Sequence, residues 1–173
     1  MQDRDSKWYV LFVMTGEEDK VKERLEYKLK NKNLKVIVPK RRLRERKNGI
    51  WEYKVRTLFP GYILINGYLN TKDYFMLKGV PGLIGILKDN NGPLEVQEEE
   101  IRVIGNLIFN NEIIDCSRIL IDNERVIVVD GPLVGMEGLI KAIDKRKGRA
   151  KVIINFIGKP KLVDLSVSMI QNF

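Results

Sequence analysis

The sequence changes its pattern near residue 111, and this change constrains the fold more than any other feature. Before it, apolar runs alternate with amphipathic segments. After it, every segment reads as a short strand followed by a turn, at 125–129, 138–143, 149–155, 161–164 and 167–170. Five short strands in so little chain favour a small barrel over a sandwich. The sequence therefore predicts an α+β chain with a first domain at 1–111, a linker at 112–121 and a β-barrel at 122–173.

In the first half, strands and helices are predicted in alternation. Residues 8–14 form a continuous apolar run, which favours a strand buried on both faces. Thr15 and Glu18 have capping-box spacing and predict the start of a helix that ends near residues 31–33. Further strands are predicted at 34–39 and 83–87, and residues 58–66 are predicted to form a Pro-Gly turn followed by a buried strand. Further helices are predicted at 71–78, capped by Asn70 or Thr71, and at 97–110.

Residues 40–56 have the pattern of an exposed β-hairpin. Asn48-Gly49 stands at its centre. This pair is a strong hairpin signal, because a type I′ turn needs positive φ at both central residues. The flanking residues alternate roughly as those of an exposed two-stranded ribbon do, and such a basic ribbon could reach a nucleic-acid backbone.

The composition excludes several kinds of chemistry. The chain has no histidine and one cysteine, Cys116. It therefore lacks serine–histidine and cysteine–histidine catalytic pairs, histidine-ligated or thiolate zinc sites and an internal disulfide. Glu98, Glu99 and Glu100 are consecutive, so on a helix they point in different directions and do not converge. The sequence predicts no enzyme activity, no metal site and no cofactor.

The positive charge is concentrated in two segments. The formal net charge is +8. Residues 40–56 hold eight basic and two acidic side chains, and residues 141–161 hold eight basic and one acidic, so the rest of the chain is net acidic. Either segment alone fits a solvated face. Two of them indicate surfaces that face phosphates.

The termini and the apolar runs bear on location. The first five residues are polar where a secretory signal needs an apolar core. The longest apolar runs are about a third of the length needed to span a bilayer. The sequence therefore predicts a cytoplasmic protein without a membrane partner.

Four motifs in a fixed order resemble the NusG family of transcription factors. Residues 125–138 (RVIVVDGPLVGMEG) resemble the KOW motif, in which Gly131, Gly135 and Gly138 would permit bends and close approach. Residues 8–10 (WYV), 59–63 (FPGYI) and 79–85 (GVPGLIG) resemble the amino-terminal (NGN) domain of that family. The resemblance covers the chain from Trp8 to Phe173 and implies an antiparallel NGN sheet flanked by helices, followed by an SH3-like KOW barrel.

The resemblance also implies partners. The NGN domain would bind the clamp helices of the largest RNA polymerase subunit through a hydrophobic depression. About half of the candidate residues are expected to be exposed, the others being core or turn formers. The hairpin would approach upstream or non-template DNA, and a monomer is expected. The polymerase-binding candidates are Tyr9, Leu58, Phe59, Pro60, Tyr62, Val80 and Pro81, and the DNA-contacting candidates are Arg41, Arg42, Arg44, Arg46 and Lys47.

Three departures from the general pattern resemble the specialised LoaP antitermination proteins of the family. The turn at 145–151 is unusually basic, Asn123-Glu124 replaces the usual Gly-Asp, and the linker is short and apolar. In LoaP proteins the barrel recognises a hairpin of nascent leader RNA. The RNA-binding candidates are Lys141, Lys145, Arg146, Lys147, Arg149, Lys151 and Lys159, with Lys161 at the margin. Phe156 is a candidate either for stacking on a base or for the family's protein contact.

Three functions stay open on the sequence alone. The leading one is an operon-specific antitermination factor that binds polymerase and an RNA hairpin. The second is a general NusG elongation factor that links polymerase to Rho or the ribosome. The third is a stand-alone, ribosome-associated RNA-binding protein with a KOW barrel. Refolding of the barrel into helices is disfavoured by its β-branched strands at 126–129 and 152–154.

Overall fold

A computed structural model describes residues 6–108 and 112–171. The chain packs as two compact units, each built from two stretches. Unit 1 comprises Met1–Pro39 and Phe59–Gln97, and unit 2 comprises Lys40–Leu58 and Glu98–Phe173. The units group residues by packing, so the domain boundaries at residues 111 and 122 stay a prediction.

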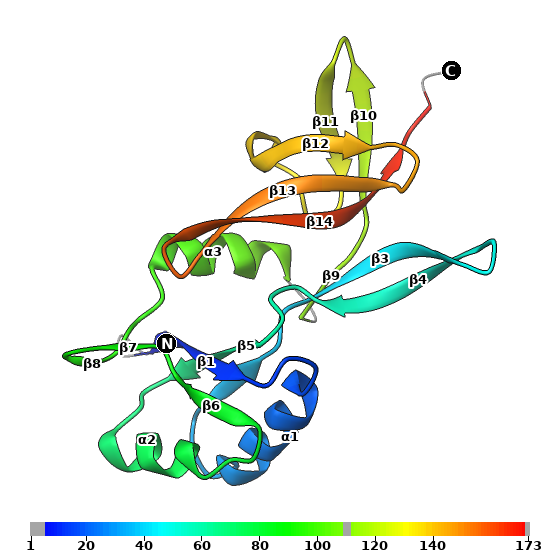
Figure 1. Cartoon of the computed structure of the whole chain (residues 1–173). Helices are drawn as coiled ribbons and strands as arrows, with labels where there is room; N and C mark the ends of the chain where they lie inside the picture. The colour runs from blue at the N-terminus through cyan, green and yellow to red at the C-terminus, as the bar shows by residue number, and fades with distance from the viewer. Residues whose placement is uncertain (1–5, 109–111, 172–173) are drawn as a thin grey trace. The chain divides into compact units, whose positions relative to one another are not determined.

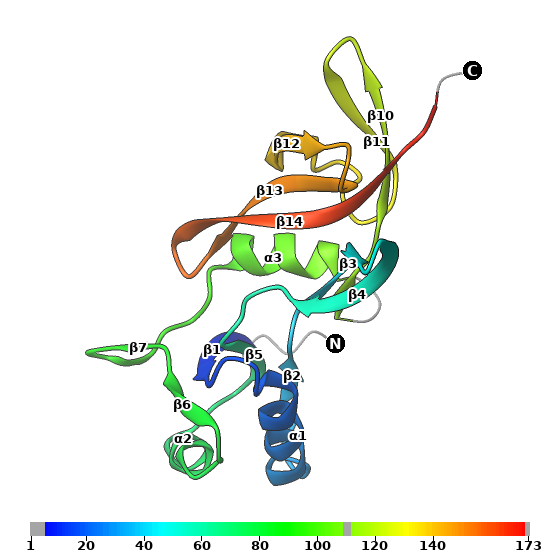
Figure 2. The ribbon, with the colours of Figure 1, turned by 45° about the vertical axis from the view of Figure 1, so that its right-hand side comes forward.

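Unit 1 is an antiparallel sheet with two helices on one side (Figures 1 and 2). The sheet order is β2-β5-β1-β6. Helix α2 begins and ends at the predicted residues, and Asn70 and Asp73 form a capping box at its start. The strands are β1 (Lys7–Val13), β2 (Lys35–Ile37), β5 (Tyr62–Gly67) and β6 (Leu83–Ile86), the helices are α1 (Glu18–Lys28) and α2 (Thr71–Lys78), and a small ribbon follows as β7 (Lys88–Asp89) and β8 (Gly92–Pro93).

The core of unit 1 follows the two periodicities of its elements. Alternate residues of β1 and β5 point to the helices. Helix α1 contributes Val21, Leu25 and Leu29, which are spaced four residues apart and pack into the same core. Val10 and Leu11 are both fully buried although they point to opposite faces of the strand. The prediction that β1 is buried on both faces is thus confirmed.

The predicted cap of α1 is wrong. Helix α1 begins at Glu18 after Glu17, and no side chain caps it. Instead, the buried Glu18 carboxylate accepts hydrogen bonds from the backbone N–H groups of Gly16, at 2.9 Å, and Gly61, at 2.7 Å. Glu18 therefore ties the start of the helix to the turn before β5, because two backbone donors there need an acceptor.

Unit 2 contains the predicted hairpin. Strands β3 (Lys40–Lys47) and β4 (Ile50–Thr57) pair in antiparallel register, and β9 (Ile113–Ile114) pairs with β3 in parallel. Asn48 and Gly49 have φ of 50° and 81°. Both central residues of the turn thus have the positive φ on which the prediction of the hairpin rested.

The rest of unit 2 is a five-stranded sheet and a helix. The sheet order is β11-β10-β14-β13-β12, with β10 parallel to β14 and the other neighbours antiparallel. The α+β class with a β-rich C-terminal part is confirmed. The elements are α3 (Glu98–Leu107), β10 (Ser117–Asp122), β11 (Arg125–Asp130), a 3-10 turn (Glu137–Leu139), β12 (Ile140–Asp144), β13 (Arg149–Phe156) and β14 (Lys159–Met169).

Two details of the strand prediction are wrong. Strand β10 covers residues 117–121 of the segment predicted as linker, together with Asp122, and lies between β11 and β14 in the sheet. The strands predicted at 161–164 and 167–170 are one strand, β14, because residues 165 and 166 continue its pairing with β13. The barrel still has five strands, but not the predicted five.

The glycines of the KOW-like segment differ in their roles. Gly131 has φ of 103°, and a Cβ there would lie 2.6 Å from the Ser117 Cα and 2.9 Å from the Cys116 carbonyl oxygen. Gly135 has positive φ but open space around it, and Gly138 has neither constraint. The predicted close approach therefore holds at Gly131 alone.

Candidate functional site

The turn between β12 and β13 presents three cations to solvent. Lys145, Arg146 and Lys147 are all exposed. The Asp144 carboxylate accepts a hydrogen bond of 2.9 Å from the Lys147 backbone N–H, and Gly148 completes the turn with φ of 64°. Within the described part of the chain, no carboxylate forms an ion pair with any of the three cations. The turn thus offers uncompensated positive charge on a fixed backbone.

Two other RNA-binding candidates are engaged inside unit 2. The Arg149 side chain is 19% exposed and lies 3.5 Å from the Asp164 carboxylate, which Lys151 also approaches at 3.4 Å. Arg149 Nη2 donates to the backbone oxygen of Arg44, at 3.2 Å, on the hairpin. Arg149 therefore joins the barrel to the hairpin and has less capacity left for a ligand than the turn residues have.

The remaining RNA-binding candidates lie away from the turn or beside it. Lys141 is exposed on β12, next to Ala142, which pairs with Lys151. Lys159 is exposed at the opposite end of β13, about 23 Å from Arg149 at the usual rise of a strand. Lys161 is partly buried on β14. The structure thus gathers the candidates at residues 141–151 and separates Lys159 from them.

The hairpin candidates divide between two faces. Arg41 turns to the barrel, where its Nη1 donates to the Asp164 backbone oxygen at 2.9 Å. Burial lowers the pKa of Arg41, with Asp164 opposing and Arg149 reinforcing the shift. Arg42 pairs with Asp115 at 3.3 Å, Arg44 lies over the Trp51 ring at 4.6 Å, and Arg46 and Lys47 are exposed near the tip. Arg41 is therefore the least accessible of the five.

The seven polymerase-binding candidates are mostly buried in this structure. Pro60 and Pro81 are exposed, and Tyr62 is partly exposed with its ring 5.4 Å from that of Phe12. Burial, and then the charge of Glu95, raise the pKa of Tyr9. The buried candidates are Tyr9, Leu58, Phe59 and Val80. The exposed surface among the seven is thus limited to two turns and one ring.

Phe156 belongs to the core. Its side chain is fully buried, so a partner could reach it only if the surface over it opened. The loop that follows is held by Glu100 of α3, whose buried carboxylate accepts from the N–H groups of Ile157, at 3.1 Å, and Gly158, at 2.9 Å. The role of Phe156 in stacking or protein binding stays a prediction.

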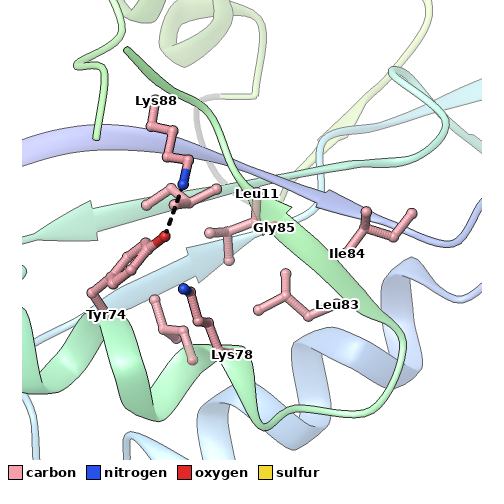
Figure 3. A pocket seen from close by; sticks show the side chains of 9 residues that line it. Leu11, Tyr74, Lys78, Leu83, Ile84, Gly85 and Lys88 are labelled. Carbon is pink, nitrogen blue, oxygen red and sulfur yellow. Dashed lines mark hydrogen bonds between the residues drawn. The ribbon is translucent and has the colours of Figure 1, made fainter. Parts of the chain in front are cut away.

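Unit 1 has a pocket that the sequence did not indicate (Figure 3). Its volume is about 420 Å³, and α2 and β6 supply most of its lining. Lys88 donates to the Tyr74 hydroxyl at 3.4 Å. The pKa of Tyr74 lies below its ordinary value, chiefly because Lys78 hydrogen-bonds the hydroxyl, and Lys88 adds to the effect. The pocket can thus take an apolar group beside an anionic one.

None of the seven polymerase-binding candidates lines this pocket. Leu83, Ile84 and Gly85 do, and they stand within the GVPGLIG motif, where only Val80 and Pro81 were chosen. The Ile84 side chain is 71% exposed. The alternation of residues along a strand does not predict this exposure, because it depends on the position of β6 at the edge of the sheet. The motif therefore indicated the right region of the chain, but only the fold shows which of its residues line the pocket.

Two further findings bear on chemistry. Among the residues that the structure describes, no three His, Cys, Asp or Glu side chains gather as metal ligands would. No helix in the same residues is long and apolar enough to cross a membrane.

The comparisons with known proteins agree over nearly the whole chain. A family model described as "Transcription termination factor nusG" matches residues 6–105, which is more than half of the chain. The transcription termination/antitermination protein NusG of Rickettsia prowazekii (strain Madrid E) is 28% identical over 171 residues, which cover 95% of this chain and 89% of that protein. The protein of the same name from Bacillus subtilis (strain 168) is 28% identical over 96% of this chain and 98% of its own length.

A solved structure shows the same likeness. The structure titled "Domain interaction in Thermotoga maritima NusG" matches with a TM-score of 0.60 and 26% identity, over 93% of each chain.

Proposed function

We propose, since this chain belongs to the NusG family of transcription termination/antitermination proteins, that it acts as an operon-specific antitermination factor. One part of the chain would bind RNA polymerase, and the barrel would bind a hairpin in the nascent leader RNA. The division at 1–111, 112–121 and 122–173 is part of this proposal. No covalent step is required of any residue.

The exposed turn at residues 145–147 carries the proposal. Three cations that form no ion pair with any described residue lie on a fixed backbone at the end of two paired strands. Side chains arranged in this way can contact phosphates on both strands of an RNA stem. An A-form stem offers its phosphates and 2′-hydroxyls rather than its base edges, so specificity would come from the shape of the hairpin or from unpaired bases.

The polymerase contact would use the exposed part of the predicted surface. Pro60, Tyr62 and Pro81 have accessible surface, and aromatic anchors within a polar rim are typical of protein–protein hot spots. The partner would be the clamp helices of the largest subunit, as the family resemblance implies. The buried candidates Tyr9, Phe59 and Val80 of unit 1 would support this surface from below. Leu58, which belongs to unit 2, stays a candidate by the family resemblance alone.

The general elongation factor is the second candidate function. It is favoured by the near full-length match to proteins named for termination and antitermination in general. The loop at residues 156–158, which resembles the family's protein-binding loop, would then contact Rho or a ribosomal protein. The burial of Phe156 means that this contact would require the loop to leave Glu100.

One experiment separates the two functions. The full chain is titrated with a pool of structured leader RNAs at several salt concentrations. Tight binding to one hairpin that persists near physiological salt is expected for the antitermination factor. Weak binding that is uniform across the pool and erased by salt would contradict it and place the general factor first.

A further inference from the structure

The two faces of the β3–β4 hairpin have different chemistry. Directly paired residues share a face, so the register assigns every side chain. One face carries the buried Leu43, and Arg41, which bonds to the barrel. The same face holds both ion pairs made within the hairpin, Glu45–Arg56 and Glu52–Lys54. This face is occupied by structural contacts, and we call it the inner face.

The outer face alternates arginines with apolar rings. Beyond the pair Lys40–Thr57 at its base, its cross-strand pairs are Arg42–Val55, Arg44–Tyr53 and Arg46–Trp51. No carboxylate of the hairpin belongs to these pairs. Tyr53 is 60% exposed, and the Arg44 guanidinium lies 4.6 Å from the centroid of the Trp51 ring. The outer face is thus a positively charged ribbon with one exposed aromatic ring, Tyr53, and one partly exposed ring, Trp51, over which Arg44 lies.

We propose that this outer face binds single-stranded RNA. Exposed aromatic rings stack with unpaired bases, and neighbouring arginines bind the backbone between them. A duplex keeps its bases stacked internally and offers no base faces to Tyr53 and Trp51. A protein partner fits less well, because three arginines interrupt the apolar surface and two of them, Arg44 and Arg46, would need an acid opposite, whereas Arg42 is already paired with Asp115.

The position of the hairpin within unit 2 selects RNA over DNA, and this step rests on the proposed function. Arg149, directly after the basic turn, donates to the backbone oxygen of Arg44 at the middle of β3. An RNA stem held by Lys145, Arg146 and Lys147 would therefore leave its flanking single strand beside the outer face. Stem and strand would be bound together by one compact unit, which raises affinity without new contacts to either part.

The test is a fluorescence anisotropy titration of the full chain with labelled oligouridine. The double variant Trp51→Ala, Tyr53→Ala is expected to lose about thirtyfold or more in affinity, because two base stacks of about 1 kcal/mol or more each are lost. Ile50→Ala is the matched control. It removes a 66% exposed apolar side chain from the inner face of the same strand and is expected to leave the affinity unchanged.

Further variants and probes distinguish a loss of binding from misfolding of the double variant. Tyr53→Phe keeps the ring and should retain binding, and unchanged far-UV circular dichroism should show that the double variant is folded. A leader hairpin that carries an oligouridine flank should bind more tightly than either the hairpin or the free oligouridine, and a blunt RNA duplex should not respond to the double substitution. Unchanged oligouridine affinity in the double variant, or no gain from joining the strand to the stem, would overturn the proposal.

Failure of the proposed function gives a different result. If the chain bound no leader hairpin but still bound oligouridine in a manner dependent on Tyr53, the assignment of the basic turn to an RNA stem would be wrong. The proposal that the outer face binds single-stranded RNA would remain supported. Loss of stem binding in the variant of Lys145, Arg146 and Lys147, with oligouridine binding retained, supports both assignments.

Discussion

The hairpin at residues 40–56 and the barrel segment at 141–161 hold equal numbers of cations and use them differently. On the hairpin, Arg42, Lys54 and Arg56 form ion pairs, Arg41 bonds to the barrel and Arg44 lies over Trp51. On the barrel turn, Lys145, Arg146 and Lys147 make no ion pair within the described residues. The number of charges in a segment therefore does not show how many are available to a ligand.

This difference predicts two kinds of binding. Uncompensated cations on a turn act over distances up to the Debye length and release counterions, so their contribution falls steeply with salt. Cations that lie among aromatic rings act at contact distance, where stacking supplies much of the energy. The barrel turn should therefore dominate the salt dependence of RNA binding, and the hairpin should contribute a part that salt affects less.

The largest expected effect comes from removing the charges of the barrel turn. Changing Lys145, Arg146 and Lys147 together to alanine should weaken stem binding about a hundredfold and reduce the slope of log affinity against log salt by about 3. The control is the triple alanine variant of Lys30, Lys35 and Lys72, exposed lysines of unit 1 that remove the same net charge. Equal losses in the two variants would mean that the net charge, and not the turn, controls binding.

The second effect concerns the junction between the two basic segments. Changing Asp164 to alanine removes the carboxylate that pairs with the partly buried Arg149 and with Lys151. It also removes the negative charge beside Arg41, which keeps its hydrogen bond to the backbone oxygen of residue 164. We expect a loss of about 2 kcal/mol in the free energy of unfolding, measured with urea, because buried cations would remain uncompensated. Asp130→Ala breaks the exposed pair with Arg118 and should cost less than about 0.5 kcal/mol. Equal costs would show that the junction does not stabilise unit 2.

The turns of the molecule show how far the sequence could predict the fold. The β3–β4 hairpin was predicted because Asn48-Gly49 suits positive φ at both positions. The turn between β10 and β11 is of the same kind, since Asn123 and Glu124 have φ of 45° and 67°. A glutamate rarely adopts this conformation, so no turn signal marked the place. Strand β10 was therefore assigned to the linker.

The site was predictable as a set of segments and less so as individual side chains. Strand alternation fixes which residues share a face, but whether Arg149 or Lys147 meets solvent depends on the partner that lies across, here Asp164 and Arg44. Phe156 is the exception, because its burial follows a local pattern: it continues the alternation of β13, in which Ala150, Val152 and Ile154 are also buried. The resemblance of residues 156–158 to a protein-binding loop favoured exposure instead.

The smallest effect concerns the inner face of the hairpin. Two hydrogen bonds from Arg56, of 3.0 and 2.7 Å, lower the pKa of Glu45. Because the folded pKa lies below the unfolded value of about 4.3, the stabilisation is complete above that value and is lost as the pH falls through the folded pKa. NMR titration of the Glu45 carboxyl group should show the lowered pKa, and Arg56→Ala should return it toward its ordinary value.

The same variant sharpens the comparison between the two segments. Removing Arg56 takes one cation from the hairpin, as removing Lys147 takes one from the turn, but Arg56 is bound to Glu45 on the inner face. Arg56→Ala should therefore leave the salt slope of RNA binding unchanged, whereas Lys147→Ala alone should lower it by about 1. Equal decreases of the salt slope in the two single variants would mean that the ion pair with Glu45 does not prevent Arg56 from contacting the RNA. The cations of the hairpin would then act like those of the turn.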